Sequence, residues 1–284
     1  MSRTHSRRYL ALWYTRRFLT YTVLIIGAVA MLVPFIYMVT TSLKTMREAF
    51  IFPPTLIPSP IVWDNYPEIF RSAPLGNVLV NSLKISTLAT LGVLCSSSLA
   101  GFTFARLTFV GKNLLFSIVL AVLMVPFQVT LIPEFLIFRE LGWVNTHLPL
   151  IVPYWFGGAF GTFLARQFFL TIPQELADAA KVDGCNPFRV YAQIFLPLAK
   201  PVLGTLAIFT FLGSWNDLLT PLIYLRDPEL MTFPLALSFF GGRYLVNLPL
   251  MMAASVLSIA PTLVLFLLLQ RYFVQGVVLS GLKA

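Results

Sequence analysis

The chain has 284 residues, of which 58% are hydrophobic and only 11% are charged. Soluble domains carry roughly 25% charged residues, so this composition excludes an ordinary soluble protein and indicates an integral membrane protein. The net charge of +9 would suit a nucleic-acid partner only if the basic residues were clustered for that purpose. Two cysteines in unlike surroundings and two scattered histidines predict neither a disulfide nor a metal site.

Six apolar segments are long enough to cross a bilayer, which predicts an all-α, polytopic membrane protein. The predicted spans cover residues 18–40, 78–104, 114–138, 148–164, 202–225 and 250–273. Together they form one domain, 18–273, which includes a polar loop at 171–200. A basic N-terminus, 1–17, precedes it as a retained anchor rather than a cleaved signal, and a tail, 274–284, follows it.

Two segments, 43–77 and 226–249, contain the prolines and paired glycines that are typical of loops with short helical pieces. If both lie outside, thirteen of the twenty basic residues fall on the inner side and six on the outer, with Lys84 near the start of a span. Inner loops of membrane proteins carry such an excess, so both termini are predicted to be cytoplasmic. The net charge then reflects topology, and no nucleic-acid partner is expected.

The second half of the span at 78–104 is small-sided, with Gly92, Ser96 and Gly101 among its residues. Small residues let helix backbones approach closely in lipid, so this face is predicted to pack tightly against another helix. The span at 148–164 contains Gly157, Gly158 and Gly161 together with a proline, which indicates a bent helix with close neighbours.

The stretch from Pro173 to Pro197 is polar and helix-forming, although apolar segments lie on both sides of it. Thr171 and Gln174 have capping-box spacing, and Pro173 suits a first helical turn. Gly184 is expected to end this helix. A second short helix is expected from Asn186 to Phe195, with Pro197 at its end.

The first of these helices carries Glu175 and Asp178 near the positive end of its dipole. Three alanines, Ala177, Ala179 and Ala180, make it thin enough to lie deep in a groove. An interfacial helix resting on lipid would instead carry lysines on its polar face, so the acidic face favours a protein partner.

The segments Asp178-Ala179-Ala180, Asp183-Gly184 and Leu196-Pro197, with Ile194, resemble the EAA loop of ABC-importer permeases. Asp178 stands where that family usually has glutamate, which shortens the reach by one methylene. Trp215-Asn216-Asp217 and the tail motifs at 270–276 and 280–283 resemble the carbohydrate-uptake branch, of the maltose-transporter type.

This resemblance implies a non-catalytic permease subunit in a bacterial or archaeal plasma membrane, surrounded by lipid. Its implied partners are a second permease, two ATPase subunits that bind ATP and magnesium, and an extracytoplasmic solute-binding protein. The polar loop would be the coupling helix, whose motion drives alternating access. The implied coupling residues are Glu175, Asp178, Ala179, Ala180, Asp183, Gly184 and Pro197.

No nucleotide site is expected in this chain itself. Gly111-Lys112 is the one Gly-Lys pair, but Asn113 follows it and Arg106 occupies the position where a phosphate loop needs glycine. ATPase activity is therefore expected on partner subunits, and this chain is expected to need no cofactor of its own.

Sugar sites combine aromatic faces with amide and carboxylate groups, and an ionisable residue within a span is a functional candidate. The alternatives for Asp217 are pairing with the partner permease or capping an outer gate. Asn81, Gln128 and Glu134 are further candidates for lining a cavity. The predicted substrate pathway comprises Trp215, Asn216, Asp217, Tyr154 and Trp155.

Within the predicted spans only Lys84 is basic, which favours a neutral sugar over an anionic substrate. The alternatives are a permease for glycerol 3-phosphate or a related solute, and an ion-coupled secondary transporter. The latter would need more carboxylates within the spans. A membrane enzyme is disfavoured because no nucleophile–base constellation is apparent.

Overall fold

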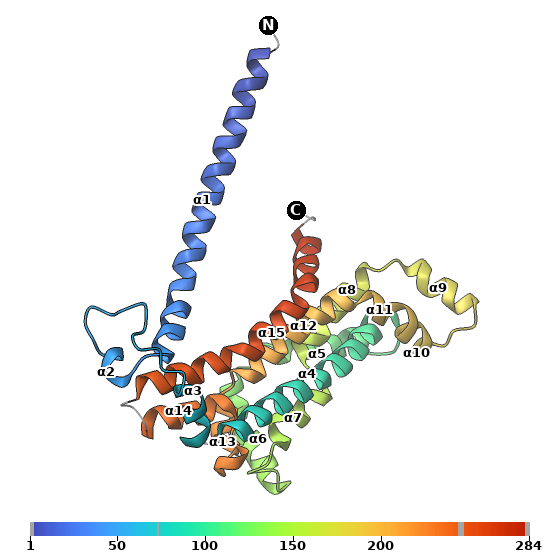
Figure 1. Cartoon of the computed structure of the whole chain (residues 1–284). Helices are drawn as coiled ribbons and strands as arrows, with labels where there is room; N and C mark the ends of the chain where they lie inside the picture. Colours follow the sequence, from blue (N-terminus) through green and yellow to red (C-terminus); the bar gives the residue numbers. More distant parts are fainter. Residues whose placement is uncertain (1–2, 73, 244–246, 282–284) are drawn as a thin grey trace. The chain divides into compact units, whose positions relative to one another are not determined.

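The computed structural model describes residues 3–72, 74–243 and 247–281 (Figure 1). Over these residues every regular element is a helix, which confirms the all-α prediction. The chain divides into two compact units, one of Met1–Arg71 with Tyr244–Leu257 and one of Ser72–Arg243 with Ser258–Ala284.

In the described part of the chain, four helical segments are long and apolar enough to cross a membrane. Two further pairs of helices are each bent within the pair. If each bent pair is counted as one span, the total is six. The four segments are Leu12–Ser42, within α1 (Arg3–Ser42); α4 (Leu75–Arg106); Leu148–Thr171; and Leu248–Gln270, within α15 (Leu248–Gly281).

The predicted span at 114–138 is not one helix. It consists of α5 (Lys112–Val122) and α6 (Phe127–Glu140), which meet at 99°. Pro126 directly precedes α6 in an extended conformation. A proline disfavours a helical conformation in the residue before it, here Val125, so the helix of α5 cannot easily continue into α6.

The predicted span at 202–225 also differs from the structure. Helix α12 (Lys200–Trp215) ends within the Trp-Asn-Asp motif, and α13 (Leu219–Tyr224) is a separate short helix. The second bent pair therefore joins residues 187–198 to α12, at 77°, and does not include residues 216–225. The break falls at Asn216, Asp217 and Leu218, and the otherwise apolar composition of 202–225 favoured one continuous span.

Close packing of α4 against α8 (Ala159–Thr171) confirms the expected role of the small residues. A Cβ added to Gly101 would lie 2.6 Å from Ala165 Cβ and 2.9 Å from the backbone nitrogen of Arg166. One added to Gly161 would lie 2.4 Å from Ser97 Oγ. The two helices therefore touch where glycine leaves no side chain.

The N-terminal end of α4 holds the segment after α13 in place. Asn81 Nδ2 donates to the carbonyl oxygens of Glu229 (2.7 Å) and Met231 (3.2 Å). Ser82 Oγ accepts from the backbone N–H of Phe233 (2.6 Å). Between these contacts lies η3 (Pro228–Leu230), and α14 (Phe233–Arg243) follows. Asn81 is thus a tether for this segment, and its predicted place in a cavity lining stays a prediction.

The segment after α1 contains the expected short helical pieces, α2 (Met46–Ala49) and α3 (Asn65–Ser72). Lys44 is buried and donates to the carbonyl oxygen of Thr55. Glu48 Oε1 accepts from Thr55 Oγ1 (3.2 Å) and from the backbone N–H of Ser59 (3.0 Å). These buried polar groups fold the segment into a defined loop, because each gains partners that replace water.

Candidate functional site

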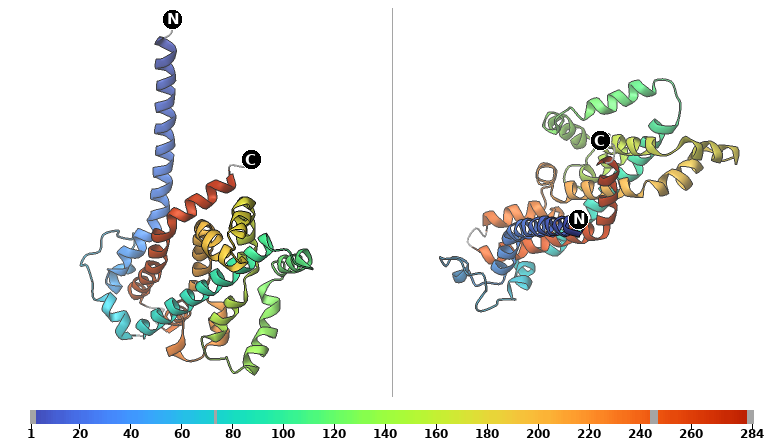
Figure 2. Two further views of the ribbon diagram at one scale, coloured as in Figure 1. Left: turned by 90° about the vertical axis from the view of Figure 1, so that its right-hand side faces the viewer. Right: turned by 90° about the horizontal axis from the view of Figure 1, so that it is seen from above.

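The polar loop begins with α9 (Gln174–Val182), which lies near the C-terminal end of α4 (Figures 1 and 2). The expected capping box is wrong. Thr171 Oγ1 instead donates to the carbonyl oxygen of Phe168 (2.8 Å), and Pro173 precedes the helix without a side-chain cap. Gly184 has φ +81°, a left-handed conformation that ends the helix region as predicted.

A second helical stretch follows, as expected, but it ends later than predicted. Asn186 caps α10 (Pro187–Val190) by accepting from the backbone N–H of Arg189 (2.8 Å). A π-helical turn, η2 (Tyr191–Phe195), then leads into α11 (Leu196–Leu198). Pro197 lies inside α11 and does not end the stretch, because a proline is tolerated in the first turn of a helix. The chain changes direction at Ala199 instead.

The alanines of α9 point in different directions. Ala177 and Ala180 are buried in a core with Phe169 of α8 and Phe195 of η2, whereas Ala179 is exposed. Two of the three small side chains therefore bring α9 close to its own chain. The face of α9 with these small side chains therefore packs inside the protein and is not a surface for a partner.

The exposed face of the loop combines acidic and apolar side chains. Val182 is 88% exposed and Phe188 is 67% exposed, and Leu176 is also exposed. An apolar surface rimmed by polar groups is typical of a protein interface. The acidic residues Glu175, Asp178 and Asp183 of the same loop are exposed as well.

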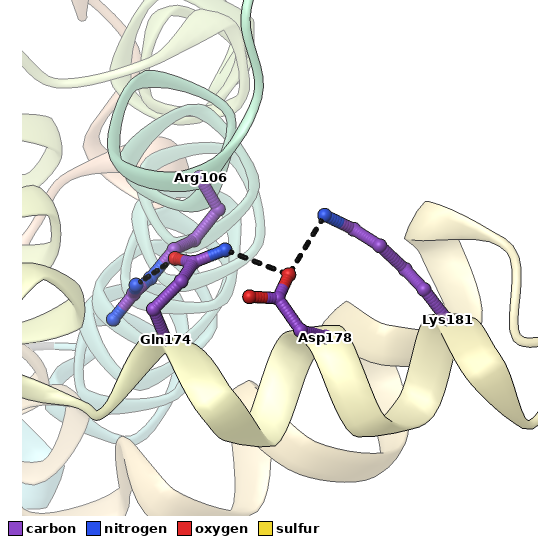
Figure 3. Close-up of polar contacts among 4 residues, drawn as sticks. All are labelled: Arg106, Gln174, Asp178 and Lys181. Carbon is purple, nitrogen blue, oxygen red and sulfur yellow. Dashed lines mark hydrogen bonds and ion pairs between the residues drawn. The ribbon is translucent and has the colours of Figure 1, made fainter.

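A chain of polar contacts joins this face to the helices behind it (Figure 3). Arg106 Nη1 donates to Gln174 Oε1 (2.5 Å), and Gln174 Nε2 donates to Asp178 Oδ1 (3.2 Å). Lys181 Nζ donates to the same oxygen of Asp178 (3.2 Å). The Asp178 carboxylate is thus already oriented by contacts within its own chain.

Hydrogen bonds from Gln174 and then Lys181 hold the pKa of the Asp178 carboxyl below its ordinary value. A lowered carboxyl pKa means that the side chain becomes protonated only at a more acidic pH. The loop therefore presents an ionised carboxylate throughout the neutral and mildly acidic range.

No coupling role was predicted for Arg106, which entered the sequence argument only as the residue that breaks a phosphate-loop pattern. It ends an apolar helix 68 positions before Gln174, so no local spacing links the two. A usable signal was its position as the last residue of a long apolar span, where an arginine can bind nearby helix carbonyls.

The Trp-Asn-Asp motif does not present three groups to a common space. Trp215 is only 1% exposed, and its Nε1 donates to the carbonyl oxygen of Ser258 (3.1 Å). Its ring stacks with those of Phe211 and Phe233. In this conformation a sugar cannot stack on Trp215, so the structure does not support its predicted role in the pathway. Asn216 is exposed and donates to the carbonyl oxygen of Leu212 (2.9 Å).

Two of the predicted pathway residues do share a cavity. Tyr154 and Asp217 line a space of about 20 Å³ together with Ser214 and Thr232. Asp217 Oδ1 also accepts from the backbone N–H of Thr220 (3.1 Å) at the start of α13. The space is large enough for about one water molecule and too small for a sugar.

The remaining candidates lie apart from this cavity lining. Trp155 covers Gly92 of α4, where an added Cβ would lie 2.6 Å from Trp155 Cδ1. Gln128 is exposed on α6 and Glu134 is partly buried on the same helix. Among the described residues, no group of three or more His, Cys, Asp or Glu side chains is arranged to hold a metal.

Known proteins are similar to this chain in sequence. The chain is 36% identical over 253 residues to the arabinooligosaccharides transport system permease protein AraQ of Halalkalibacterium halodurans, covering 88% of this chain and 90% of AraQ. It is 32% identical over 267 residues to the sn-glycerol-3-phosphate transport system permease protein UgpE of Pectobacterium atrosepticum, covering 91% and 95%.

Solved structures agree on the fold. A chain of a bacterial ABC transporter that imports the acidic polysaccharide alginate superimposes with a TM-score of 0.79 at 22% identity, covering 96% of this chain and 99% of that one. A bacterial alginate ABC transporter in complex with an alginate pentasaccharide-bound periplasmic protein gives 0.66 at 16% identity, covering 90% and 93%. Residues 92–279 match a family of membrane transport subunits. The chain therefore belongs to the binding-protein-dependent transport system inner membrane components, the permease subunits of ABC importers.

Proposed function

We propose that this permease imports a neutral sugar or oligosaccharide, using ATP hydrolysed by two partner subunits. A second permease would complete the pathway, and an extracytoplasmic solute-binding protein would deliver the substrate. Both termini would be cytoplasmic, which places the polar loop on the side where ATP is available. The ATPase subunits would contact this loop and, by moving it, drive alternating access.

The observation that carries this proposal is the exposed face of α9 and α10. It offers an oriented carboxylate, Asp178, one helical turn before the exposed Val182, and Phe188 is exposed on α10. A partner groove with basic groups and an apolar floor would complement it. Glu175 and Asp183 would add to the negative charge, and Gly184 would set the turn between the two helices.

For the substrate, the two relatives reported above indicate different classes of solute. AraQ and UgpE are named as permease proteins of transport systems for arabinooligosaccharides and sn-glycerol 3-phosphate, respectively. An anionic substrate would call for basic groups along its path, yet Lys84 is the one basic residue in the interior of the six spans predicted from the sequence. We therefore favour a neutral sugar, and glycerol 3-phosphate or a related solute is the second candidate.

Import is expected to depend on ATP and on the partner subunits. Proteoliposomes containing the complete importer should accumulate sugar when binding protein is present outside and ATP inside. Vesicles containing this chain alone should show no uptake above background, with or without an ion gradient. Uptake by the isolated chain driven by a sodium or proton gradient would contradict the proposal and indicate a secondary transporter.

Asp217 and Tyr154 are the proposed substrate-pathway residues that the cavity brings together. Asp217→Asn keeps an acceptor for the Thr220 N–H but removes the charge, so the break before α13 should survive. We expect transport at saturating binding protein to fall about tenfold, because a hydrogen bond to a charged group contributes about 1.5 kcal/mol or more. Glu140→Gln on α6 is the charge-matched control and should transport normally. An unaltered rate in Asp217→Asn would exclude a role in the pathway.

A further inference from the structure

Arg106 is the last residue of α4, and its guanidinium contacts three other elements of the same unit. Nη1 donates to Gln174 Oε1 of α9 at 2.5 Å. Nη2 donates to the carbonyl oxygen of Phe169 in α8, at 2.5 Å, and to that of Ile172 just beyond it. The guanidinium carbon also lies 4.9 Å from the centre of the Phe195 ring in η2. Four helical elements thus meet at a single cation.

This arrangement depends on the chemistry of arginine. The two backbone carbonyls lie at the C-terminal end of α8, where the helix dipole is negative and a cation is stabilised. The planar guanidinium can bind carbonyls through one nitrogen and Gln174 through another, which the ammonium group of a lysine cannot reproduce in the same geometry. The first residue of α9 is thereby linked to the ends of both α4 and α8.

Behind Arg106, α4 and α8 are in close contact through Gly101, which faces Ala165 and the backbone of Arg166. Closely packed helices resist sliding, so a displacement delivered to the end of one is shared by the other. By contrast, α9 contributes only the small side chains of Ala177 and Ala180 to the buried core. Among the described residues, the Arg106–Gln174 hydrogen bond is the one hydrogen bond that joins a side chain of α9 to a side chain of α4.

We infer that Arg106 is a positioning residue for energy coupling, which makes α9 move together with the α4–α8 pair. The inference rests on the proposed function, because it assumes that the ATPase subunits displace α9. Arg106 acts on α9 through its hydrogen bond to Gln174, on the side of α9 that faces α4. The same glutamine also donates to Asp178 and so orients its carboxylate (Figure 3). Without this link, α9 would be joined to α8 through Ile172 and Pro173 but to α4 only through its alanine contacts, so α4 would lag behind.

The test is the stoichiometry of the complete importer in proteoliposomes, measured as ATP hydrolysed per sugar imported. In Arg106→Met we expect the subunits to co-purify and this ratio to rise about tenfold, because hydrolysis continues while movement of the pathway helices is lost. Arg106→Lys keeps the positive charge but loses the separate N–H donors of the planar guanidinium, so an intermediate ratio is expected. Gln174→Leu should raise the ratio in a complex whose Arg106 carbonyl contacts are intact.

A double-mutant cycle separates coupling from general damage. If Arg106 acts through Gln174, the variant carrying both Arg106→Met and Gln174→Leu should be no worse than Arg106→Met alone. Effects that simply multiply would overturn the inference. The inference would also be overturned if Arg106→Lys and Gln174→Leu both hydrolysed the same amount of ATP per sugar as the unmodified importer. These two variants decide the question if Arg106→Met does not fold.

Arg166→Met is the matched control. Arg166 lies at the same end of the helix pair, where its Nε donates to the carbonyl oxygen of Phe104 (3.2 Å) and its guanidinium carbon lies 4.1 Å from the centre of the Phe116 ring. These contacts involve α4 and α5 rather than α9. Its ratio should stay within about twofold of the unmodified importer, as expected for a cation without a link to the displaced helix. A tenfold rise here as well would overturn the specific role of Arg106.

The proposed function and this inference fail in different ways. If Asp178→Lys leaves both ATPase binding and import unchanged, the loop is not the coupling site and the proposed function is wrong. If Asp178→Lys blocks import but the Arg106 and Gln174 variants keep the normal ratio, the loop is the coupling site and only the role of Arg106 is overturned.

Discussion

Asp178→Lys is expected to abolish ATP-driven import while leaving membrane insertion of the chain intact. The Asp178 carboxylate is exposed, and its Oδ1 accepts from Gln174 and from Lys181 at 3.2 Å. A lysine at this position would lose both contacts, stand beside Lys181, and meet the basic groups expected of the partner groove. Loss of one member of an interfacial charge pair costs about 2–5 kcal/mol, which corresponds to roughly thirtyfold or more in affinity.

The measurements for this variant are co-purification of the ATPase subunits with the permease, and uptake by proteoliposomes. Asp178→Glu restores the family's usual residue and should be active. Asp178→Asn keeps an acceptor without the charge and should bind the ATPase subunits more weakly than the unmodified chain does. Glu140→Lys, a reversal of an exposed acidic residue on α6, controls for a general effect of charge. A fully active Asp178→Lys importer would contradict the coupling role.

Gly101→Val is expected to cause the largest loss of stability. Its Cβ alone would lie 2.6 Å from Ala165 Cβ and 2.9 Å from the backbone nitrogen of Arg166. Backbone cannot turn aside as a long side chain can, so α4 and α8 must separate. Overpacking costs typically about 1–3 kcal/mol, and we expect the upper end of this range because the obstacle is partly backbone.

The check is thermal unfolding of the purified permease in detergent, with size-exclusion chromatography to detect aggregation. Gly76→Val on the same helix is the matched control, because no atom lies within 4 Å of a Cβ added at Gly76. Gly101→Ala should fall between the unmodified chain and Gly101→Val. If Gly101→Val and Gly76→Val unfold at the same temperature, the close approach of α4 and α8 does not contribute to stability.

Several features of this protein were predicted correctly from local sequence because their physical causes are local. Hydropathy identifies the apolar helices, since a segment in lipid must satisfy its own backbone hydrogen bonds. Gly184 ends the first loop helix because glycine adopts positive φ without a clash. Asn186-Pro187 starts the next helix, since the asparagine side chain accepts from the N–H of Arg189 three residues later.

Local sequence was a poor guide wherever two conformations had similar local preference. Pro197 suits either the end of a helix or its first turn, and the structure uses it in a first turn. Thr171 and Gln174 have the spacing of a capping box, yet Gln174 is engaged by Arg106 and Asp178 instead. In the segment 202–225 the break between α12 and α13 falls at Asn216 and Asp217, and their polar side chains were interpreted as a substrate site within one continuous span rather than as a helix end.

Composition and short motifs thus identified a helical membrane permease with a polar loop between apolar helices. They could do so because hydrophobicity and helix capping act over a few residues or one span. Tertiary contact decided which loop residues face inward, and it joined Arg106 to Gln174 across 68 positions. It also buried Trp215 beneath Phe211 and Phe233 and left Asp217 with Tyr154 on one small cavity. Such contacts depend on how distant helices pack, a property that no local pattern contains.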